Sequence, residues 1–93
     1  MTFQKDSLID RPSLVHIYPN PFKDRITFEI NDRFEDLPIS FEMYNTLGQL
    51  LASYEFPYEL TKIEMDTKNF ASGTYFFFIK YGGKPQKIVK MVK

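Results

Sequence analysis

The sequence predicts an all-β fold, an immunoglobulin-like β-sandwich of about seven strands in one domain. Three observations lead to this prediction: short runs of alternating apolar and polar residues, turn residues at close intervals between them, and almost no helical periodicity. The chain has 93 residues and no cysteine, so a hydrophobic core must hold it together without disulfides. Ten phenylalanines and six tyrosines supply apolar area for that core, and the lack of Trp and Cys excludes a true antibody-type domain.

Each expected strand is justified by its own pattern. The second and third alternate cleanly between apolar and polar residues, the sixth has the highest β propensity in the chain, and the first is the weakest. Proline interrupts the pattern after the fourth strand, because it cannot donate to a ladder. The expected strands are Leu14–Tyr18, Ile26–Ile30, Ile39–Tyr44, Leu50–Tyr54, Lys62–Met65, Thr74–Tyr81 and Gln86–Val92. Pattern alone does not give their pairing order.

Glycine and asparagine mark the turns between these strands. In the sequence NTLGQ, Asn45 and Gly48 tolerate left-handed backbone geometry and predict a hairpin. The pair Gly82 and Gly83 closes the sixth strand in the same way. Gly73 stands between a loop and the strongest strand, where we expect a backbone geometry that a side chain would strain.

A rigid Pro-Asn-Pro segment, Pro19 to Pro21, precedes the second strand. Both prolines fix their own φ and lack an N–H, and Pro21 keeps Asn20 out of the helical region. We expect this segment to end the first strand and to let the chain cross the top of the sandwich. Asn20 and Asp24 are expected to hydrogen-bond loop amides in a structural corner, not to act in catalysis.

Charge is unevenly distributed although the formal net charge is zero. Residues 1–66 carry twelve acidic and six basic residues, whereas residues 67–93 carry six lysines and no acid. We expect the basic last strand to pair beside acidic earlier strands, so that the fields cancel. Nucleic-acid binding is not favoured, because the basic segment lacks arginine and the domain as a whole is not basic. No apolar run approaches the ~18 residues of a membrane helix, so membrane insertion is not expected.

The residues of catalysis and metal binding are scarce. There is one histidine, His16, no cysteine nucleophile and no Gly-x-Ser-x-Gly elbow, so no enzyme activity and no cofactor are expected. An acidic loop places four oxygen-bearing side chains within six residues, but their spacing differs from that of an EF-hand loop, and acidic loops are usually solvated. We therefore predict no metal site at these residues, which are Asn31, Asp32, Glu35 and Asp36.

Four motifs occur in order along the chain: YPNP at the start, YNTLGQ in the hairpin, FASGTY before the strongest strand, and a lysine-rich closing strand. In this order the sequence from Val15 to Lys93 resembles the C-terminal sorting domain of the type IX secretion system of Bacteroidetes-type bacteria, type A family. Phe70 stands where that family usually has leucine. The residues that match the family motifs, and are candidates for partner recognition, are Pro19, Asn20, Pro21, Asp24, Asn45, Gly48, Gln49, Gly73, Tyr75, Lys87 and Lys90.

The resemblance implies a domain that does no chemistry. It implies that the domain guides an upstream cargo from the periplasm through the outer membrane to the cell surface or the medium, and that a surface sortase then removes it. The implied partners are the type IX translocon, its periplasmic shuttle proteins, the sortase and the cargo domain. Residues 1–14 are then expected to be linker or residues foreign to the domain. The first ten residues lack the features of a signal peptide, which suggests an excised fragment of a longer protein.

A stand-alone immunoglobulin-like adhesion or carbohydrate-binding module is the alternative. If Tyr75, Phe77 and Ile79 face the core, then Phe76 and Phe78 point the other way and are either covered by a loop or form an exposed apolar patch. Such a patch is a candidate for recognition or self-association. In the adhesion reading the contact surface consists of Phe56, Tyr58, Phe76 and Phe78.

Overall fold

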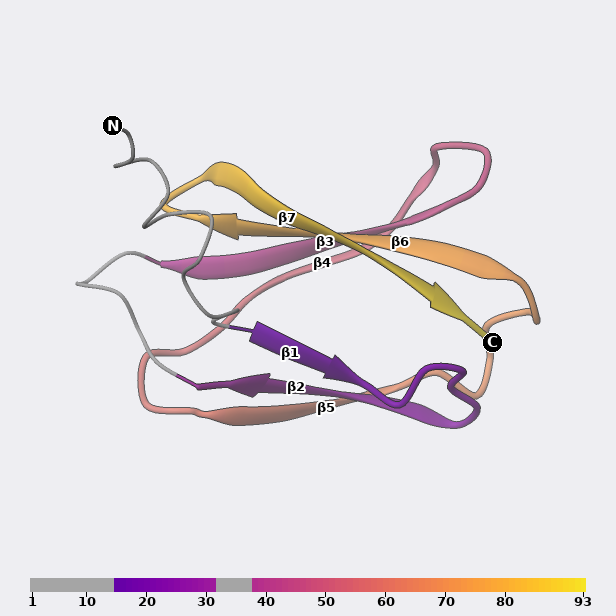
Figure 1. Ribbon diagram of the computed structural model, residues 1–93, viewed down its shortest axis with the longest axis horizontal. Coiled ribbons are helices and arrows are strands. Elements are labelled where there is room, and N and C mark those ends of the chain that lie inside the picture. Colours follow the sequence, from indigo (N-terminus) through magenta and orange to yellow (C-terminus); the bar gives the residue numbers. More distant parts are fainter. Residues whose placement is uncertain (1–14, 32–37) are drawn as a thin grey trace, which may run out of the picture.

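The computed structural model describes residues 15–31 and 38–93 and confirms the β-sandwich. Seven strands form two antiparallel sheets, and the described residues contain no helix (Figure 1). The strands are β1 (Val15–Tyr18), β2 (Arg25–Ile30), β3 (Ile39–Asn45), β4 (Leu50–Glu55), β5 (Lys62–Asp66), β6 (Thr74–Tyr81) and β7 (Lys84–Val92). The smaller sheet has the order β1-β2-β5 and the larger one the order β4-β3-β6-β7.

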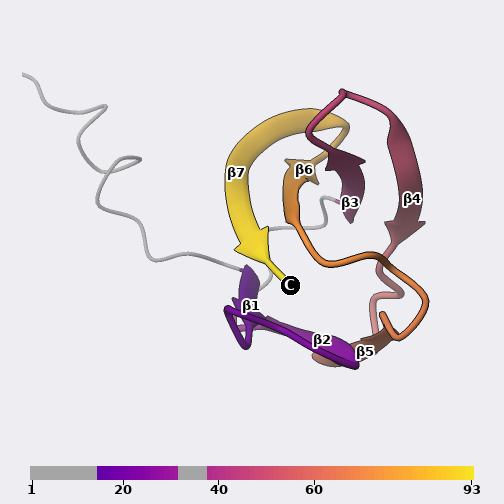
Figure 2. The same ribbon diagram turned by 90° about the vertical axis from the view of Figure 1, so that its right-hand side faces the viewer.

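Viewed end-on, the two sheets pack face to face, and β7 curves over one open side toward β1 (Figure 2). Lys87 reaches across this side, where its Nζ donates a hydrogen bond to the Val15 carbonyl at 3.2 Å. The fourth strand pairs with the third, whereas in a constant-type antibody domain it belongs to the other sheet.

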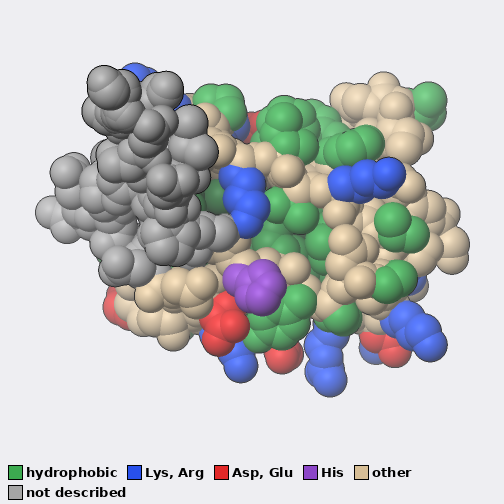
Figure 3. Space-filling model, in the orientation of Figure 1, with side chains coloured by type: hydrophobic (Ala, Val, Ile, Leu, Met, Phe, Trp, Pro, Cys, Tyr) green, Lys and Arg blue, Asp and Glu red, His purple; other side chains and the backbone are tan. Residues whose placement is uncertain are grey.

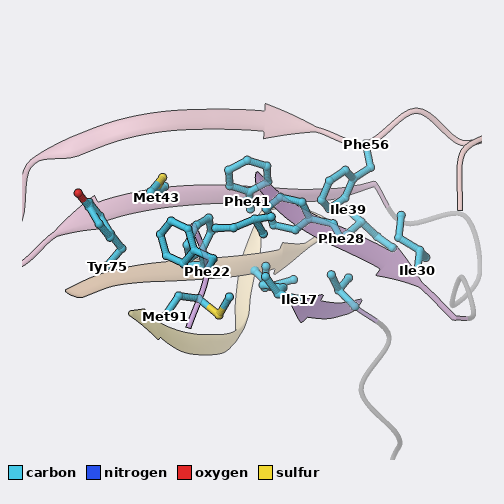
Figure 4. Packing of buried hydrophobic residues seen from close by; sticks show 14 residues of the cluster. Ile17, Phe22, Phe28, Ile30, Ile39, Phe41, Met43, Phe56, Tyr75 and Met91 are labelled. Atoms are coloured by element: carbon cyan, nitrogen blue, oxygen red, sulfur yellow. The ribbon is translucent and has the colours of Figure 1, made fainter. Parts of the chain in front are cut away.

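The core lies between the sheets and consists mainly of inward-facing residues of β1, β2, β3 and β6, to which Phe22 and Phe56 add from loops and Met91 from β7. Phe28 of β2 stacks on Phe41 of β3 with ring centroids 4.6 Å apart, which joins the two sheets at the centre (Figure 4). Phe77 of β6 meets both rings at 5.7 Å. Such aromatic contacts add stability beyond that of buried area. The core residues are Val15, Ile17, Phe22, Ile26, Phe28, Ile30, Ile39, Phe41, Met43, Phe56, Tyr75, Phe77, Ile79 and Met91.

Two expectations about the course of the chain and one about its charges are wrong. The Pro-Asn-Pro segment does not cross the sandwich, because β1 and β2 are antiparallel neighbours in one sheet. The last strand begins at Lys84 and contains Pro85, which an edge strand tolerates because one side of its backbone faces outward. Finally, β7 pairs with β6, which carries no acid, so the lysines of β7 are not neutralised by an acidic neighbouring strand.

Some predictions concern residues outside the described part of the chain. These are the linker expected at residues 1–14 and three of the four residues of the acidic loop, Asp32, Glu35 and Asp36. Within the described residues no cluster of His, Cys, Asp and Glu could hold a metal ion, and no helix could span a membrane.

Candidate functional site: the corner between the Pro-Asn-Pro segment and the last strand

The motif residues from the two ends of the domain meet at one corner of the sandwich. Asn20 Nδ2 donates to the Lys90 carbonyl at 3.0 Å, and the Val92 amide donates to Asn20 Oδ1 at 3.0 Å. Next to this contact, the Phe22 amide donates to the Val92 carbonyl at 2.8 Å. Asn20 and Val92 are 72 residues apart, so the corner forms only when β7 is in place.

The Asn20 side chain acts as a short piece of neighbouring strand. A strand edge presents a carbonyl and an amide two residues apart, and a carboxamide offers one donor and one acceptor that satisfy both. The peptide bonds before Pro19 and Pro21 are both cis. The expectation that Asn20 bonds loop amides is therefore wrong, because its partners belong to β7.

Lys93 closes the same corner from the other side, and the sequence pattern did not indicate it. Its Nζ donates to the carbonyls of Thr67 at 2.6 Å, Phe70 at 2.7 Å and Lys68 at 3.3 Å. Its backbone amide and carbonyl also pair with those of Gly73 at 2.8 and 3.1 Å. Three carbonyls converge because residues 67–70 form a tight turn, in which the Phe70 amide donates to the Thr67 carbonyl. A charge surrounded by backbone oxygens is a strong form of hydrogen bonding.

Thr67 links this turn to the start of β2. It is completely buried, its Oγ1 donates to the Lys23 carbonyl at 3.0 Å, and its amide donates to the Asp24 carbonyl at 2.8 Å. Both contacts involve the backbone of residues 23 and 24, so the exposed Asp24 side chain is held on a fixed support.

The step from Gly73 to Tyr75 completes the corner. Gly73 has φ of +152°, and Tyr75 O–H donates to the Ala71 carbonyl. A tyrosine at the start of a strand whose hydroxyl bonds the backbone a few residues upstream is the tyrosine corner of immunoglobulin-like sandwiches. The Tyr75 ring lies 5.9 Å from the rings of both Phe22 and Phe70, so the leucine-to-phenylalanine difference is accommodated within the corner.

The hairpin motif lies at the same end of the larger sheet, but its hydrogen bonds are all within residues 45–49. Asn45 Oδ1 accepts the amides of Leu47 at 2.9 Å and Gln49 at 3.0 Å, and Asn45 Nδ2 donates to Gln49 Oε1 at 2.7 Å. Gly48 takes φ of +82° and donates its amide to the Asn45 carbonyl. The predicted role of these residues in a β3–β4 turn is confirmed by this geometry.

The two motif lysines of β7 occupy different environments. Lys90 is exposed, whereas Lys87 faces inward opposite Ile79 and is half-buried. Burial lowers the pKa of Lys87, because the ammonium loses hydration.

The aromatic pair Phe76 and Phe78 does point away from the core, onto the outer face of the larger sheet, but both rings are half-buried there. The Tyr44 ring meets the Phe78 ring edge-on at 5.1 Å. Beside them Glu42 accepts the Tyr44 hydroxyl at 2.7 Å and the Lys80 ammonium at 2.9 Å. The hydrogen bonds from Tyr44 and Lys80 lower the pKa of Glu42, because they stabilise the carboxylate. The bond to Glu42 raises the pKa of Tyr44, because only the protonated hydroxyl can donate it.

The adhesion surface expected from Phe56, Tyr58, Phe76 and Phe78 does not form as predicted. Phe56 is buried in the core against Phe28 and Phe41, whereas Tyr58 is about half exposed, at 52%. His16 is also exposed, and its ring lies 5.2 Å from that of Tyr18 (Figure 3).

An open trough of about 1020 Å³ runs along the outer face of the smaller sheet, directly below the corner. Its lining includes Pro19, Pro21 and Asp24 of the corner and, beside them, Tyr18 and Thr27. Basic and acidic side chains alternate along this edge of the molecule (Figure 3). The trough thus combines apolar rings with both signs of charge, which suits a polypeptide better than a small apolar ligand.

Comparison with known proteins agrees with this arrangement. The chain gives no match to curated proteins, but a family model described as secretion system C-terminal sorting domain matches residues 16–93. That span contains every residue of the corner and of the hairpin. The chain therefore belongs to the family of type IX secretion C-terminal sorting domains.

Proposed function

We propose that this domain directs an upstream cargo protein across the outer membrane through the type IX translocon, assisted by periplasmic shuttle proteins, and is then removed by a surface sortase. Membership of the family supports the coarser role of a C-terminal secretion signal. The domain does no chemistry in this proposal, requires no cofactor, and passes through the periplasm before its cargo reaches the cell surface or the medium.

The observation that carries the proposal is the corner itself. The motif residues at the two ends of the domain are joined there by Asn20, whose side chain bonds the backbone at Lys90 and Val92. An unfolded or incomplete chain cannot present this surface, because its two halves come from opposite ends of the sequence. The corner therefore distinguishes a folded domain from an unfolded one, which a machinery that exports folded cargo requires.

We propose that the recognised surface consists of the exposed side chains around the corner, Pro19, Pro21, Asp24 and Lys90. The other motif residues support it from below: Asn20, Gly73 and Tyr75 make the corner, and Lys87 holds β7 to β1. Asn45, Gly48 and Gln49 shape a separate hairpin.

The test is a fusion of the full 93-residue chain to the C-terminus of a soluble reporter that carries a periplasmic export signal, expressed in a host with the type IX machinery. We expect the reporter at the cell surface. Asp24→Lys and Lys90→Glu should leave the reporter in the periplasm, because each reverses a charge of the proposed recognised surface. Both side chains are exposed, so we expect the domain to stay folded. Glu59→Lys, an exposed change remote from the corner, is the matched control.

Circular dichroism and thermal melting of each purified variant separate loss of recognition from loss of folding. The proposal is contradicted if the intact fusion stays periplasmic while another sorting domain exports the same reporter. If the fusion is exported but the Asp24 and Lys90 variants are exported equally well, the domain is a sorting signal whose recognised surface lies elsewhere.

A further inference from the structure

Among the described residues the two sheets have four edge strands, β1, β5, β4 and β7. Exposed edges invite pairing with other chains, and proteins protect them with short strands, charges or proline. Strand β1 has four residues and ends at a proline, β5 carries three charges in five residues, and β7 contains Pro85 and three lysines. Strand β4 has six residues, no proline and no lysine, and its single charge is its last residue, Glu55.

The backbone of β4 offers free pairing positions in a regular stretch. Ser40 pairs with Glu55, and the Phe56 amide donates to the Ile39 carbonyl. In an antiparallel ladder this makes the Ser40–Glu55 pair a non-hydrogen-bonded one, so the amide and carbonyl of Glu55 point away from β3. Ser53 lies two residues earlier and points the same way. The register shift of β4 falls before Ala52 and leaves residues 52–55 regular.

This edge is complementary to itself. Two antiparallel copies of β4 related by a two-fold axis through Ser53 pair Ser53 with Ser53, and Leu51 with Glu55 of the other copy. The Ser53 pair therefore uses an outward-pointing position. Leu51 lies within the register shift, where its amide turns toward β3, and only its side chain faces Glu55 of the other copy, so Glu55 never faces another charge. On the inner face the small Ala52 stands opposite the large Tyr54, whose ring is 44% exposed although it packs against Phe41 and Phe56.

Few charges lie near the edge: Glu55 ends the strand, and Glu42, which pairs with Ser53 across the ladder to β3, is bonded to Lys80. Residues 45–54 contain no acid and no base. At the hairpin end of the strand Leu47, Leu50 and Leu51 are exposed to 81%, 55% and 38%. A second copy of the same edge covers part of this apolar surface and meets no like charge.

We propose that β4 is a self-association edge, at which two copies of this chain join their four-stranded sheets into one continuous eight-stranded sheet with the two-fold axis at Ser53. The proposal is independent of the sorting function and of the corner, because β4 contributes no residue to it. The partner at this edge is a second copy of the chain. When β4 pairs with β4 of the second copy around Ser53, no two like charges stand opposite each other. The contact is short, so we expect a weak, concentration-dependent dimer.

Sedimentation of the purified chain over a range of concentrations is the first test. The apparent mass should rise from 11.0 kDa toward twice that value. Ser53→Lys should keep the chain monomeric at every concentration, because it places two ammonium groups opposite each other at the axis. Ser72→Lys is the matched control, since it makes the same change at another exposed serine and should dimerise like the parent. A mixture of Ser53→Lys and Ser53→Asp chains should restore a dimer.

Cysteine cross-linking tests the register. The chain has no cysteine of its own, so one introduced thiol reports one position. Ser53→Cys should form a disulfide-linked dimer on mild oxidation, because opposed residues of an antiparallel pair lie about 5.5 Å apart at Cα. Leu51→Cys alone should link at least tenfold more slowly, since its copies are about 13 Å apart, four residues along the strand. Leu51→Cys mixed with Glu55→Cys should link readily.

A parent chain that is monomeric throughout overturns the proposal, as does dimerisation that Ser53→Lys leaves intact. Cross-linking that is no faster at Ser53 than at Ser72→Cys overturns it as well. Binding of the monomer to lipid vesicles through the hairpin leucines, without dimerisation, would assign the edge to another occupant.

Discussion

Gly73 shows how a single backbone angle supports the corner. Its φ of +152° is one that L side chains rarely adopt, yet no atom lies within 4 Å of the place where a Cβ would be. A substitution there is therefore strained by backbone geometry and not by a clash. We expect Gly73→Val to lower the free energy of unfolding by roughly 1 to 3 kcal/mol. Urea denaturation measures this, with Ser72→Val as the control, and a midpoint equal to that of the parent would contradict it.

The ammonium group of Lys87 loses hydration in the folded state, and its neighbours only partly offset the free energy that this costs. Its pKa is lowered by burial, so the unfolded chain binds this proton more tightly than the folded chain does. The stability of the fold therefore rises with pH between the lowered pKa and the ordinary lysine pKa. Replacing Lys87 with Met keeps the stem and removes the buried charge, so we expect equal or higher stability at neutral pH. Lys87→Glu should instead cost about 1 to 3 kcal/mol, because it loses the bond to Val15 and places a carboxylate beside the core.

Thermal melts at neutral pH compare the two Lys87 variants, and Lys90→Glu, at an exposed position of the same strand, is the matched control. Equal melting temperatures for Lys87→Glu and Lys90→Glu would show that the inward position of Lys87 has no energetic consequence.

For single residues, the sequence predicts the hydrogen-bonding role when the partners are close along the chain and misses it when the partners are distant. Asn45, Gly48 and Gln49 lie within five residues of each other, so their turn follows from local chemistry. The bonds of Asn20 to β7 and of Lys93 to the turn at residues 67–70 span 23 or more residues. Such contacts depend on strand order, which the periodicity of one segment does not contain.

The outer face of the larger sheet joins two neighbouring strands through a small polar cluster. Glu42 of β3 accepts hydrogen bonds from Tyr44 and from Lys80 of β6. Because the pKa of Glu42 is lowered in the folded state, Glu42 contributes to folding stability above the ordinary pKa of a glutamate. This contribution is lost as pH falls through the pKa of Glu42 in the folded state. Because the pKa of Tyr44 is raised, its contribution is present below the ordinary tyrosine pKa and is lost as pH rises through the folded one.

We expect Glu42→Gln to flatten the loss of stability in acid, measured as the urea midpoint at a series of pH values. The effect should be small, because both charged side chains remain about one quarter exposed. Glu59→Gln, on an exposed loop, should reproduce the acid limb of the parent. An unchanged acid limb in Glu42→Gln would show that the cluster does not couple to folding.

Strand existence follows from period-two patterning, whereas strand ends and order do not. All seven expected strands form: β1, β2, β3 and β6 bury alternate side chains between the sheets, whereas β4 and β5 cover the core only with partly buried residues. Strand β7 extends past its predicted start because its ladder with β6 runs down to the turn at Gly82 and Gly83, with Pro85 tolerated at the edge. The pairing of β4 with β3 follows from the intervening turn, but the crossing from β4 to β5 in the other sheet leaves no periodic signature.

For the whole molecule, the uneven distribution of charge becomes a surface property. The lysines of the last strand are not opposed by an acidic neighbour strand, so the β7 side keeps its basic character. The trough below the corner carries both signs of charge. The basic character of the last strand therefore persists in the fold, beside a trough of mixed charge.

The position of β1 determines how the domain responds to a pull on its cargo. The upstream chain leaves at Val15, whereas the corner lies toward the opposite end, where the chain ends (Figure 1). Val15 pairs with Ile30 and Tyr18 with Thr27, and Pro19 and Asn20 of the corner follow directly after Tyr18. A force on the upstream chain, with the corner held, is therefore carried along the β1 backbone, and the ladder to β2 does not have to open for the force to reach the corner. In the proposed function, a pull on the cargo thus reaches the recognised surface with both sheets intact.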